Sequence, residues 1–415
     1  MRRPLVLFAA LAVVATSLSG QTYRGFRSEW DEVIGKARII LGPLRVFPSF
    51  SIRNVGYDDN VNFDAKAKGD YTGTISPAVK VYWPVGGTIL LSASENPEYN
   101  YYARESFRRS FSNSYTFGMK TLLLSRFVLL GNTTRAAHRR RLSSELGTLV
   151  TDELRGFDAG LFFETARQTS LGVTVFRNEI GYENLQMEDS SLPLSQVLNR
   201  KEWGGKAEFY YQAFTEGFFY LVGEYTEFEF KNPESAWRNA SAIQGTIGLR
   251  FPVGAAIRGN LAFGYKRFRP NLEARPSYSG LFGKTDLNAR FGRIGLRARY
   301  GRDTIFSYLA EALFFVENAV GGGVSLYLTD FLRLDYDYNR GTSDYPEFLV
   351  FDPVADGSLN IGRKDRHETH SAGIAVRLFG TTGLGLTWNS ALWTSSLPGW
   401  DRRRRFIGAF LTYQF

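Results

Sequence analysis

Two histidines three residues apart, His367 and His370, are the feature of this chain that most resembles a metal site. The paired-histidine zinc motif needs two histidines four residues apart on a helix. These two open a predicted strand instead, where residues three apart face opposite ways. The chain has 3 His and no Cys, which excludes thiolate metal sites, disulfides and cysteine nucleophiles. We therefore predict no metal ion, no cofactor and no enzymatic activity.

An acidic group, Tyr57-Asp58-Asp59-Asn60, offers the hard oxygen ligands that Ca²⁺ prefers. Its spacing matches no calcium loop, and Asp and Asn also start turns by bonding their own backbone. We interpret the group as a solvated turn.

Runs of arginine could bind phosphate, because a guanidinium pairs with a phosphate group through two hydrogen bonds. Two such runs occur, and both fall at predicted strand ends. We regard them as candidate contacts with lipopolysaccharide phosphates, with solvated loop charge as the alternative; they are Arg139, Arg140, Arg141, Arg402, Arg403, Arg404 and Arg405.

These residues must be positioned by strands, because alternation with a period of two runs through most of the chain. The last ten residues show it best. Ile407, Ala409, Leu411, Tyr413 and Phe415 fall on one side of an extended segment. Aromatic residues at the very end suit the interfacial girdle of a membrane barrel. We predict that Tyr413 and Phe415 form an assembly signal for the barrel-assembly machinery.

Eighteen segments share this alternation, and short connections alternate with long ones along the chain. Short turns on one side and long loops on the other are typical of bacterial barrels, with the turns periplasmic and the loops extracellular. We therefore predict an all-β fold, an antiparallel transmembrane β-barrel of about 18 strands, with 16 as the alternative, spanning residues 44–415. The predicted strands are 44–56, 70–83, 87–103, 110–124, 127–140, 153–166, 169–183, 198–214, 217–231, 239–252, 255–268, 285–300, 304–316, 321–328, 331–341, 367–379, 382–395 and 403–415.

One stretch, Asp286–Tyr300, fits less well because its apolar parity switches near Gly292. A β-bulge would realign the faces. A misplaced strand end is the other interpretation.

The first twenty residues read as a secretory signal peptide: a basic start at Arg2-Arg3, an apolar run from Leu5 to Val14, and a small-residue exit. The apolar run is too short to span a bilayer as a helix. Residues 21–43 form an N-terminal segment, periplasmic or lumenal, in which a short amphipathic helix could form. Ser28 and Asp31 resemble its capping box, and Gly42-Pro43 would end it.

Charged side chains cannot face lipid at mid-bilayer without a cost of a few kcal/mol, so parity assigns them to the lumen. In this way Arg333, Asp335 and Asp337 face inward while Leu334 and Tyr336 face lipid. Basic candidates outnumber acidic ones, which predicts a mild preference for anions. The lumen-lining candidates are Lys80, Arg250, Arg258, Lys266, Arg333, Asp335, Asp337 and Arg377.

The segment Pro48–Val61, PSFSIRNVGYDDNV, resembles the opening strand and acidic-Asn loop of a largely uncharacterised family of bacterial outer-membrane β-barrel porins. The terminal phenylalanine and the strand count are similar too, and the resemblance extends over residues 40–415. It implies fold and location more than substrate, and it implies no catalytic residues.

Together these features predict a porin of a Gram-negative outer membrane that passes small polar solutes. Its partners would be outer-membrane lipid, lipopolysaccharide and the barrel-assembly machinery. The formal net charge of +9 would also suit nucleic acid, but export argues against that partner. One alternative is an outer-membrane component of an envelope polysaccharide export or assembly system. A second is a rim-located hydrolase barrel. The oligomeric state is not predicted.

Overall fold

The computed structural model describes residues 25–37, 39–140, 145, 149–165, 169–184, 193–214, 217–251, 256–309, 311–347, 349–352, 357–360, 362–378 and 382–414. The predicted signal peptide, Arg141 and Phe415 lie outside these residues.

A single antiparallel sheet closes on itself, because the first wall strand β2 pairs with the last, β22, from Ser49↔Gln414 to Asp58↔Phe406. The sheet has 20 strands, of which β1 is a short addition, while β4 and β5 both pair with β3 and β6 and share one position in the wall. The wall therefore has 18 strands, and the predicted antiparallel 18-stranded β-barrel is confirmed.

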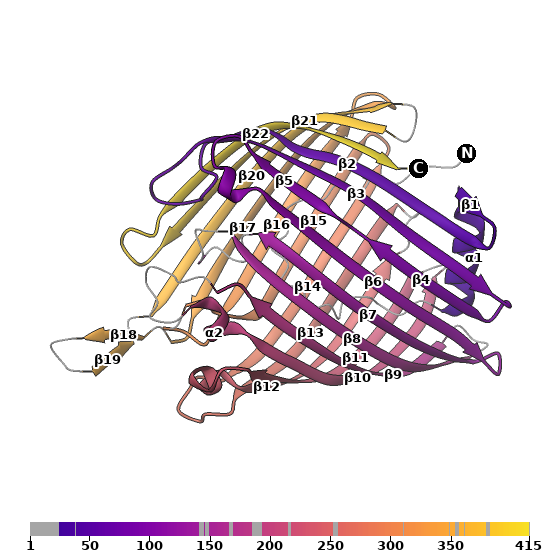
Figure 1. Cartoon of the computed structure of the whole chain (residues 1–415), viewed down its shortest axis with the longest axis horizontal. Coiled ribbons are helices and arrows are strands. Elements are labelled where there is room, and N and C mark those ends of the chain that lie inside the picture. The colour runs from indigo at the N-terminus through magenta and orange to yellow at the C-terminus, as the bar shows by residue number, and fades with distance from the viewer. Residues whose placement is uncertain are drawn as a thin grey trace.

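The wall runs in chain order around the barrel (Figure 1). Its strands are β2 (Leu44–Asp58), β3 (Asp70–Val85), β4 (Ile89–Glu95) with β5 (Glu98–Tyr102), β6 (Ser110–Leu123), β7 (Phe127–Arg140), β8 (Val150–Glu164), β9 (Thr169–Tyr182), β10 (Arg200–Phe214), β11 (Gly217–Phe230), β12 (Ala240–Phe251), β13 (Ile257–Pro270), β14 (Tyr278–Phe291), β15 (Ile294–Phe306), β16 (Phe314–Tyr327), β17 (Leu332–Tyr345), β20 (Arg363–Leu378), β21 (Thr382–Ser395) and β22 (Arg402–Gln414).

The connections are short at one end of the barrel, here called the turn end, and long at the other, the loop end. The turn end also carries the C-terminal end of β22 (Figure 1). The loop end carries α2 (Leu194–Leu198), the 3₁₀ helices η2 (Ser106–Arg108) and η3 (Pro233–Arg238), and the hairpin of β18 (Leu349–Asp352) and β19 (Gly357–Asn360).

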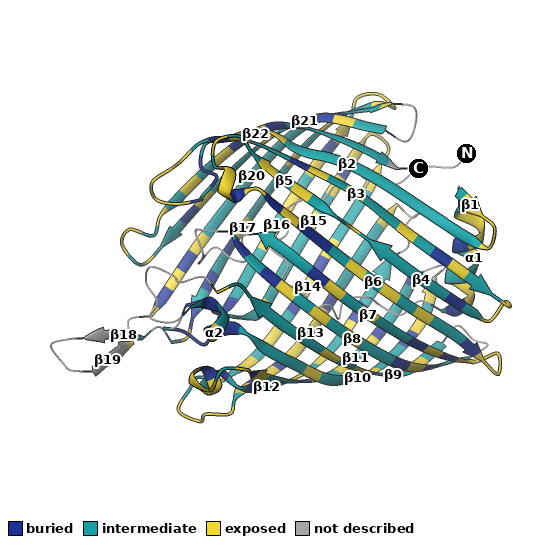
Figure 2. Ribbon diagram, viewed as in Figure 1, coloured by how far each residue is buried: buried dark blue, intermediate teal, exposed yellow. Residues whose placement is uncertain are grey.

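Exposed and less exposed residues alternate along most wall strands (Figure 2). The outward residues in mid-strand are mostly large and apolar, such as Leu129, Leu161, Val173, Leu221 and Ile247, all at least 40% exposed. So much exposed apolar surface would be unusual in water and is what a lipid-facing wall requires.

Three predicted strands between residues 285 and 328 were misplaced. The chain turns at Gly292-Arg293, with a positive φ of 58° at Gly292, so β14 and β15 form a hairpin across that point. The parity switch there marks a strand end, and the bulge interpretation is wrong. The predicted turn at Gly301–Asp303 lies inside β15, where these residues continue the strand and pair with β16, because Gly and Asp can also occupy strand positions.

The N-terminal segment forms α1 (Phe26–Lys36), followed by β1 (Ile39–Leu41), which folds back on the start of β2 through Gly42-Pro43. The predicted cap was wrong: Ser28 lies inside the helix, and Gly25 precedes its first residue without a side-chain cap. No helix in the described part of the chain is long and apolar enough to cross a membrane.

Candidate functional site

The barrel encloses a cavity of about 3340 Å³, lined by wall strands and by one side of α1. Seven of the eight predicted lumen residues line it: Lys80, Arg250, Arg258, Arg333, Asp335, Asp337 and Arg377. The eighth, Lys266, is buried in the wall at the loop end, where its Nζ lies 2.6 Å from the Asp303 carboxylate.

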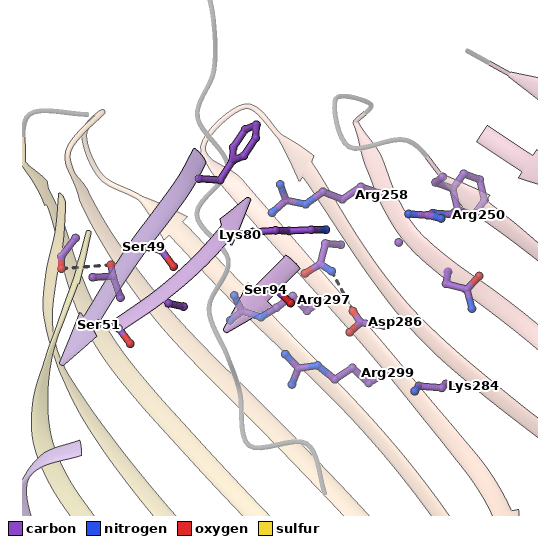
Figure 3. A pocket seen from close by; sticks show the side chains of 18 of the residues that line it. Ser49, Ser51, Lys80, Ser94, Arg250, Arg258, Lys284, Asp286, Arg297 and Arg299 are labelled. Atoms are coloured by element: carbon purple, nitrogen blue, oxygen red, sulfur yellow. Dashed lines mark hydrogen bonds between the residues drawn. The ribbon is translucent and has the colours of Figure 1, made fainter. Parts of the chain in front are cut away.

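Four consecutive strands, β12 to β15, carry six of the fourteen lysines and arginines that line the cavity (Figure 3). Cross-strand register sets Arg250 beside Asn260, Asp286 beside Arg299, and Asn288 beside Arg297. We call this surface the basic wall; it comprises Arg250, Arg258, Lys284, Arg290, Arg297 and Arg299, with Asp286 as its one acidic residue among those that line the cavity.

The sequence prediction missed four members of the basic wall, Lys284, Arg290, Arg297 and Arg299. The misplaced strand boundaries assigned them no consistent face. The signal was present nonetheless. With the turn placed at Gly292, the charged residues of β14 all have even residue numbers and so share one face. Arg297 and Arg299 of β15, which lie on the same face of the sheet, both have odd numbers.

Two aspartates on β17 neutralise part of this charge. Arg297 donates two hydrogen bonds to Asp337, at 2.8 and 2.7 Å, and a longer one of 3.3 Å to Asp335. Arg333 donates to Asp335 from the same strand, at 2.7 Å. Within the described residues, Arg258 and Lys284 have no ion pair and leave their charge open to the lumen.

The strands across the barrel from the basic wall line the cavity mostly with hydroxyl groups, and their basic residues there are Arg53, Lys80 and Lys120. β4 and β5 occupy the third wall position and β14 the twelfth, so they lie on opposite sides of an 18-stranded wall. We call this surface the hydroxyl wall; its cavity-lining members are Ser49, Ser51, Ser76, Ser92, Ser94 and Thr116. A solute in the cavity therefore meets denser positive charge on one side, and mainly neutral hydrogen-bonding groups on the other.

The cavity as a whole keeps a positive balance. Fourteen lysines and arginines line it against ten aspartates and glutamates, an excess of four. Fixed charges in a pore favour ions of the opposite sign, although screening weakens the effect in a wide lumen.

At the turn end, α1 packs against an inward-facing apolar surface of the wall. Phe26 and Val33 are 0% and 3% exposed, and they belong to one cluster with Leu90, Leu130 and Phe162. The backbone N–H of Phe26 donates to Glu164 Oε1 at 2.8 Å, and Glu29 forms an ion pair with Lys120 of β6. Apolar residues are unusual inside a water-filled barrel, so this surface serves to hold the helix.

At the loop end, loop segments and strand ends pack together in apolar clusters. Leu194, Val197 and Leu198 of α2 pack with Val150 and Phe230, and all five are buried. Further apolar clusters join Leu313 to Phe268 and Leu309 to Tyr345. The loop end is therefore a packed layer rather than a fringe of solvated loops.

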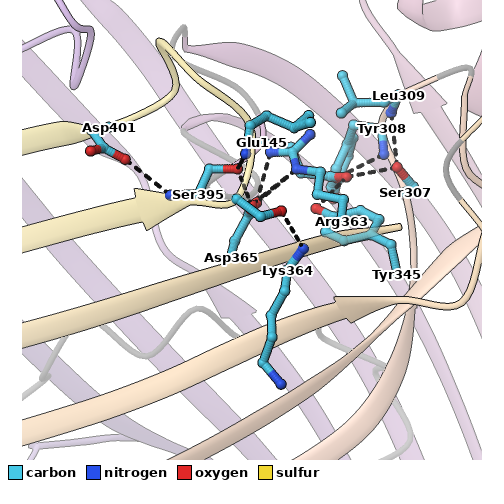
Figure 4. A network of polar contacts seen from close by, with 12 residues as sticks. Glu145, Ser307, Tyr308, Leu309, Tyr345, Arg363, Lys364, Asp365, Ser395 and Asp401 are labelled. Carbon is cyan, nitrogen blue, oxygen red and sulfur yellow. Dashed lines mark hydrogen bonds and ion pairs between the residues drawn. The ribbon is translucent and has the colours of Figure 1, made fainter. Parts of the chain in front are cut away.

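Buried charge ties this layer together (Figure 4). The Glu145 carboxylate accepts hydrogen bonds from Ser307 Oγ at 2.6 Å, from the Tyr308 backbone N–H at 2.9 Å and from the Tyr345 hydroxyl at 2.8 Å. Arg238, 0% exposed, donates to the carbonyl oxygens of Ser307 and Leu309 at 3.0 and 2.6 Å. Burial raises the pKa of Glu145. It lowers the pKa of Arg238 to about 9, so the guanidinium stays charged at neutral pH.

No protein-family model and no curated protein matches the chain. Among solved structures, OccK3 (OpdO) of Pseudomonas aeruginosa is similar over 89% of this chain and 95% of its own, with 15% identity and a TM-score of 0.47. The siderophore receptor PirA of Pseudomonas aeruginosa is similar over 89% of this chain and 80% of its own, with 8% identity and a TM-score of 0.47. These similarities are of overall architecture and carry no information about what passes through this lumen.

The arginine runs do not form continuous patches, because neighbouring residues of a strand point to opposite faces. Arg140 turns toward Asp152, with Nε–Oδ1 at 3.1 Å, and Arg404 donates to Asp58 at 2.7 Å and lines the cavity. Arg139 is half-buried, and Arg402 stacks over the Trp400 ring. Arg403 and Arg405 are exposed on the outer face.

The remaining polar motifs are engaged within the wall and its loops. His367 stacks on Trp393, whereas the ring of His370 bonds the hydroxyl of exposed Tyr336. The two imidazoles therefore lie on opposite faces of β20 and cannot bind one metal ion. The Asn60 backbone N–H donates to Asp58 Oδ1 at 3.0 Å, so the acidic group forms a turn, but both residues are only 1% exposed and the predicted solvation is wrong.

Replacing Arg238 with methionine should loosen the loop end. The change leaves two buried carbonyl groups without donors, at about 1–3 kcal/mol each, and removes a positive charge near Glu145. We expect faster proteolysis of the loop segments and more frequent current fluctuations, with the wall intact. Limited proteolysis followed by mass spectrometry measures the first effect. Arg269→Met on the exposed face is the control, and equal cleavage of the two variants would contradict a structural role for Arg238.

Proposed function

We propose that the protein is a channel of a Gram-negative outer membrane that passes small polar solutes with a mild preference for anions. One observation carries this proposal: a closed wall with an apolar exterior surrounds a polar cavity of about 3340 Å³ in which bases exceed acids. Closed barrels satisfy every backbone hydrogen bond within the wall, which a bilayer requires of any spanning structure. In this orientation the turn end is periplasmic and the loop end extracellular.

The direct test is electrical. Purified, refolded protein is inserted into planar bilayers, and single-channel currents and the reversal potential in a salt gradient are recorded. We expect discrete conductance steps and a reversal potential of anion-selective sign. A correctly folded barrel without conductance would contradict the channel, whereas a cation-selective channel would contradict the role of the basic wall.

We also propose that the C-terminal aromatics direct assembly by the barrel-assembly machinery. Tyr413 pairs with Phe50 of β2 at the seam where the barrel closes, so the last strand must be positioned before closure. Phe415→Asp should sharply reduce the amount of folded barrel in the outer membrane, measured as heat-modifiable mobility of envelope fractions. Gln414→Asp, one residue away, is the matched control. Normal levels of folded Phe415→Asp protein would contradict this role.

A further inference from the structure

Three arginines, Arg135, Arg155 and Arg177, stand on the outer face of three consecutive strands, β7, β8 and β9. All three are exposed and none lines the cavity. They share the face of Leu129, Leu161 and other apolar residues of the lipid-facing wall. A charged side chain on this face costs a few kcal/mol near mid-bilayer, and this cost falls toward zero near the interface. The three arginines must therefore lie at the bilayer surface or be neutralised by an anion.

Register brings these arginines together although they are about twenty residues apart in sequence. Arg135 pairs directly with Arg155 across β7 and β8. Arg177 pairs with Phe157, two residues from Arg155 on the same face. Direct cross-strand neighbours have Cβ atoms about 5 Å apart, and diagonal ones about 7–8 Å. Like charges placed directly opposite one another destabilise a sheet, so the Arg135–Arg155 pair favours a further anion at this place.

The nearby acidic residues, Glu153 and Glu179, neutralise the three arginines only in part, and both lie beside Arg155. Within the described residues, Arg135 and Arg177 have neither a hydrogen bond nor an ion pair. Arg155 meets Glu153 only at 3.7 Å, with both side chains more than half exposed. Glu179 lies directly opposite Arg155 across β8 and β9, but its carboxylate forms its ion pair with Lys231.

Aromatic residues frame the three arginines. Tyr115 lies opposite Arg135, and Trp203 lies opposite Arg177. Phe157 pairs with Arg177 on one side and with Thr133 on the other. These three side chains are 39%, 48% and 55% exposed, respectively. Tyr and Trp on the outside of a barrel mark the level of the lipid headgroups, and the longer connections beyond this level place it toward the loop end.

We propose that Arg135, Arg155 and Arg177 form a binding site for the phosphate groups of an anionic lipid of the outer leaflet, of the lipopolysaccharide class. The proposal rests on the outer-membrane location proposed above. A guanidinium binds phosphate through paired hydrogen bonds, and three of them on adjacent strands match a headgroup that carries more than one phosphate. The aromatic residues would pack against the acyl chains and sugar rings just below and beside it.

The test compares lipid retained by the folded, full-length protein in nanodiscs of phosphatidylcholine to which phosphorylated lipid A is added. The variant carries Arg135→Gln, Arg155→Gln and Arg177→Gln. We expect its affinity for lipid A to fall by about tenfold or more, because one charge-assisted hydrogen bond contributes on the order of tenfold. Native mass spectrometry of the protein released from nanodiscs counts the bound lipids.

A matched control carries Arg267→Gln, Arg269→Gln and Arg340→Gln, which are exposed arginines outside this cluster. It should retain lipid A as the unaltered protein does. Equal loss in the control, equal binding of dephosphorylated lipid A, or full displacement by millimolar inorganic phosphate would each overturn the proposal. Conductance of the same samples is recorded separately, so that a failed channel and a failed lipid site are distinguishable.

Discussion

A channel in which Phe26 and Val33 are both changed to alanine is expected to pass more current than the unaltered protein. These side chains are 0% and 3% exposed and hold α1 inside the lumen at the turn end. Truncating a buried phenylalanine alone costs about 3–5 kcal/mol. An isolated helix of 11 residues is marginal in water, so α1 should leave its position once this packing is lost.

Single-channel conductance measures the effect, and we expect larger steps with fewer partial closures. Ile34→Ala is the control, because Ile34 lies on the same helix but is 41% exposed. The chain has no cysteine, so a cysteine introduced at Ser28 reports on α1 through its labelling rate. If α1 becomes labelled while conductance stays unchanged, the helix does not restrict the ion path.

The wall of the barrel was predictable because its rule is local. Alternation of apolar and polar residues follows from the two faces of a strand, and it identified eighteen strands without any knowledge of contacts. It failed where turn-forming residues occupy strand positions, as at Gly301–Asp303, and the lumen residues Arg297 and Arg299 were missed with it. A positive φ at Gly292 decides that turn, and the residue type alone does not reveal which glycine adopts it.

The two ends of the barrel were less predictable because their contacts join distant segments. Glu145 and Ser307 are 162 residues apart, and no periodicity relates them. The arginine clusters show the same limit. A run such as Arg402–Arg405 divides between two faces, whereas Arg135, Arg155 and Arg177, which are widely spaced in sequence, gather on one face through strand register.

Replacing Arg250, Arg258, Lys284 and Arg299 with glutamine is expected to abolish the anion preference of the channel. The residues lining the cavity carry an excess of four positive charges, and these four substitutions remove it. Arg297 stays in place because it donates two hydrogen bonds to Asp337 and a longer one to Asp335, and its loss would remove the closest partner of Asp337. The reversal potential in a salt gradient should move close to zero.

The difference in reversal potential between the variant and the unaltered protein should grow as ionic strength falls, because the screening length rises from about 10 Å at 0.1 M salt to about 30 Å at 0.01 M. The matched control carries the same substitution at Arg267, Arg269, Arg340 and Arg366, which are exposed and do not line the cavity. It changes the net charge of the protein equally but should leave the reversal potential unaltered. If both variants shift selectivity alike, ions respond to the overall charge of the protein. If neither variant shifts the selectivity, the ion path does not follow the basic wall.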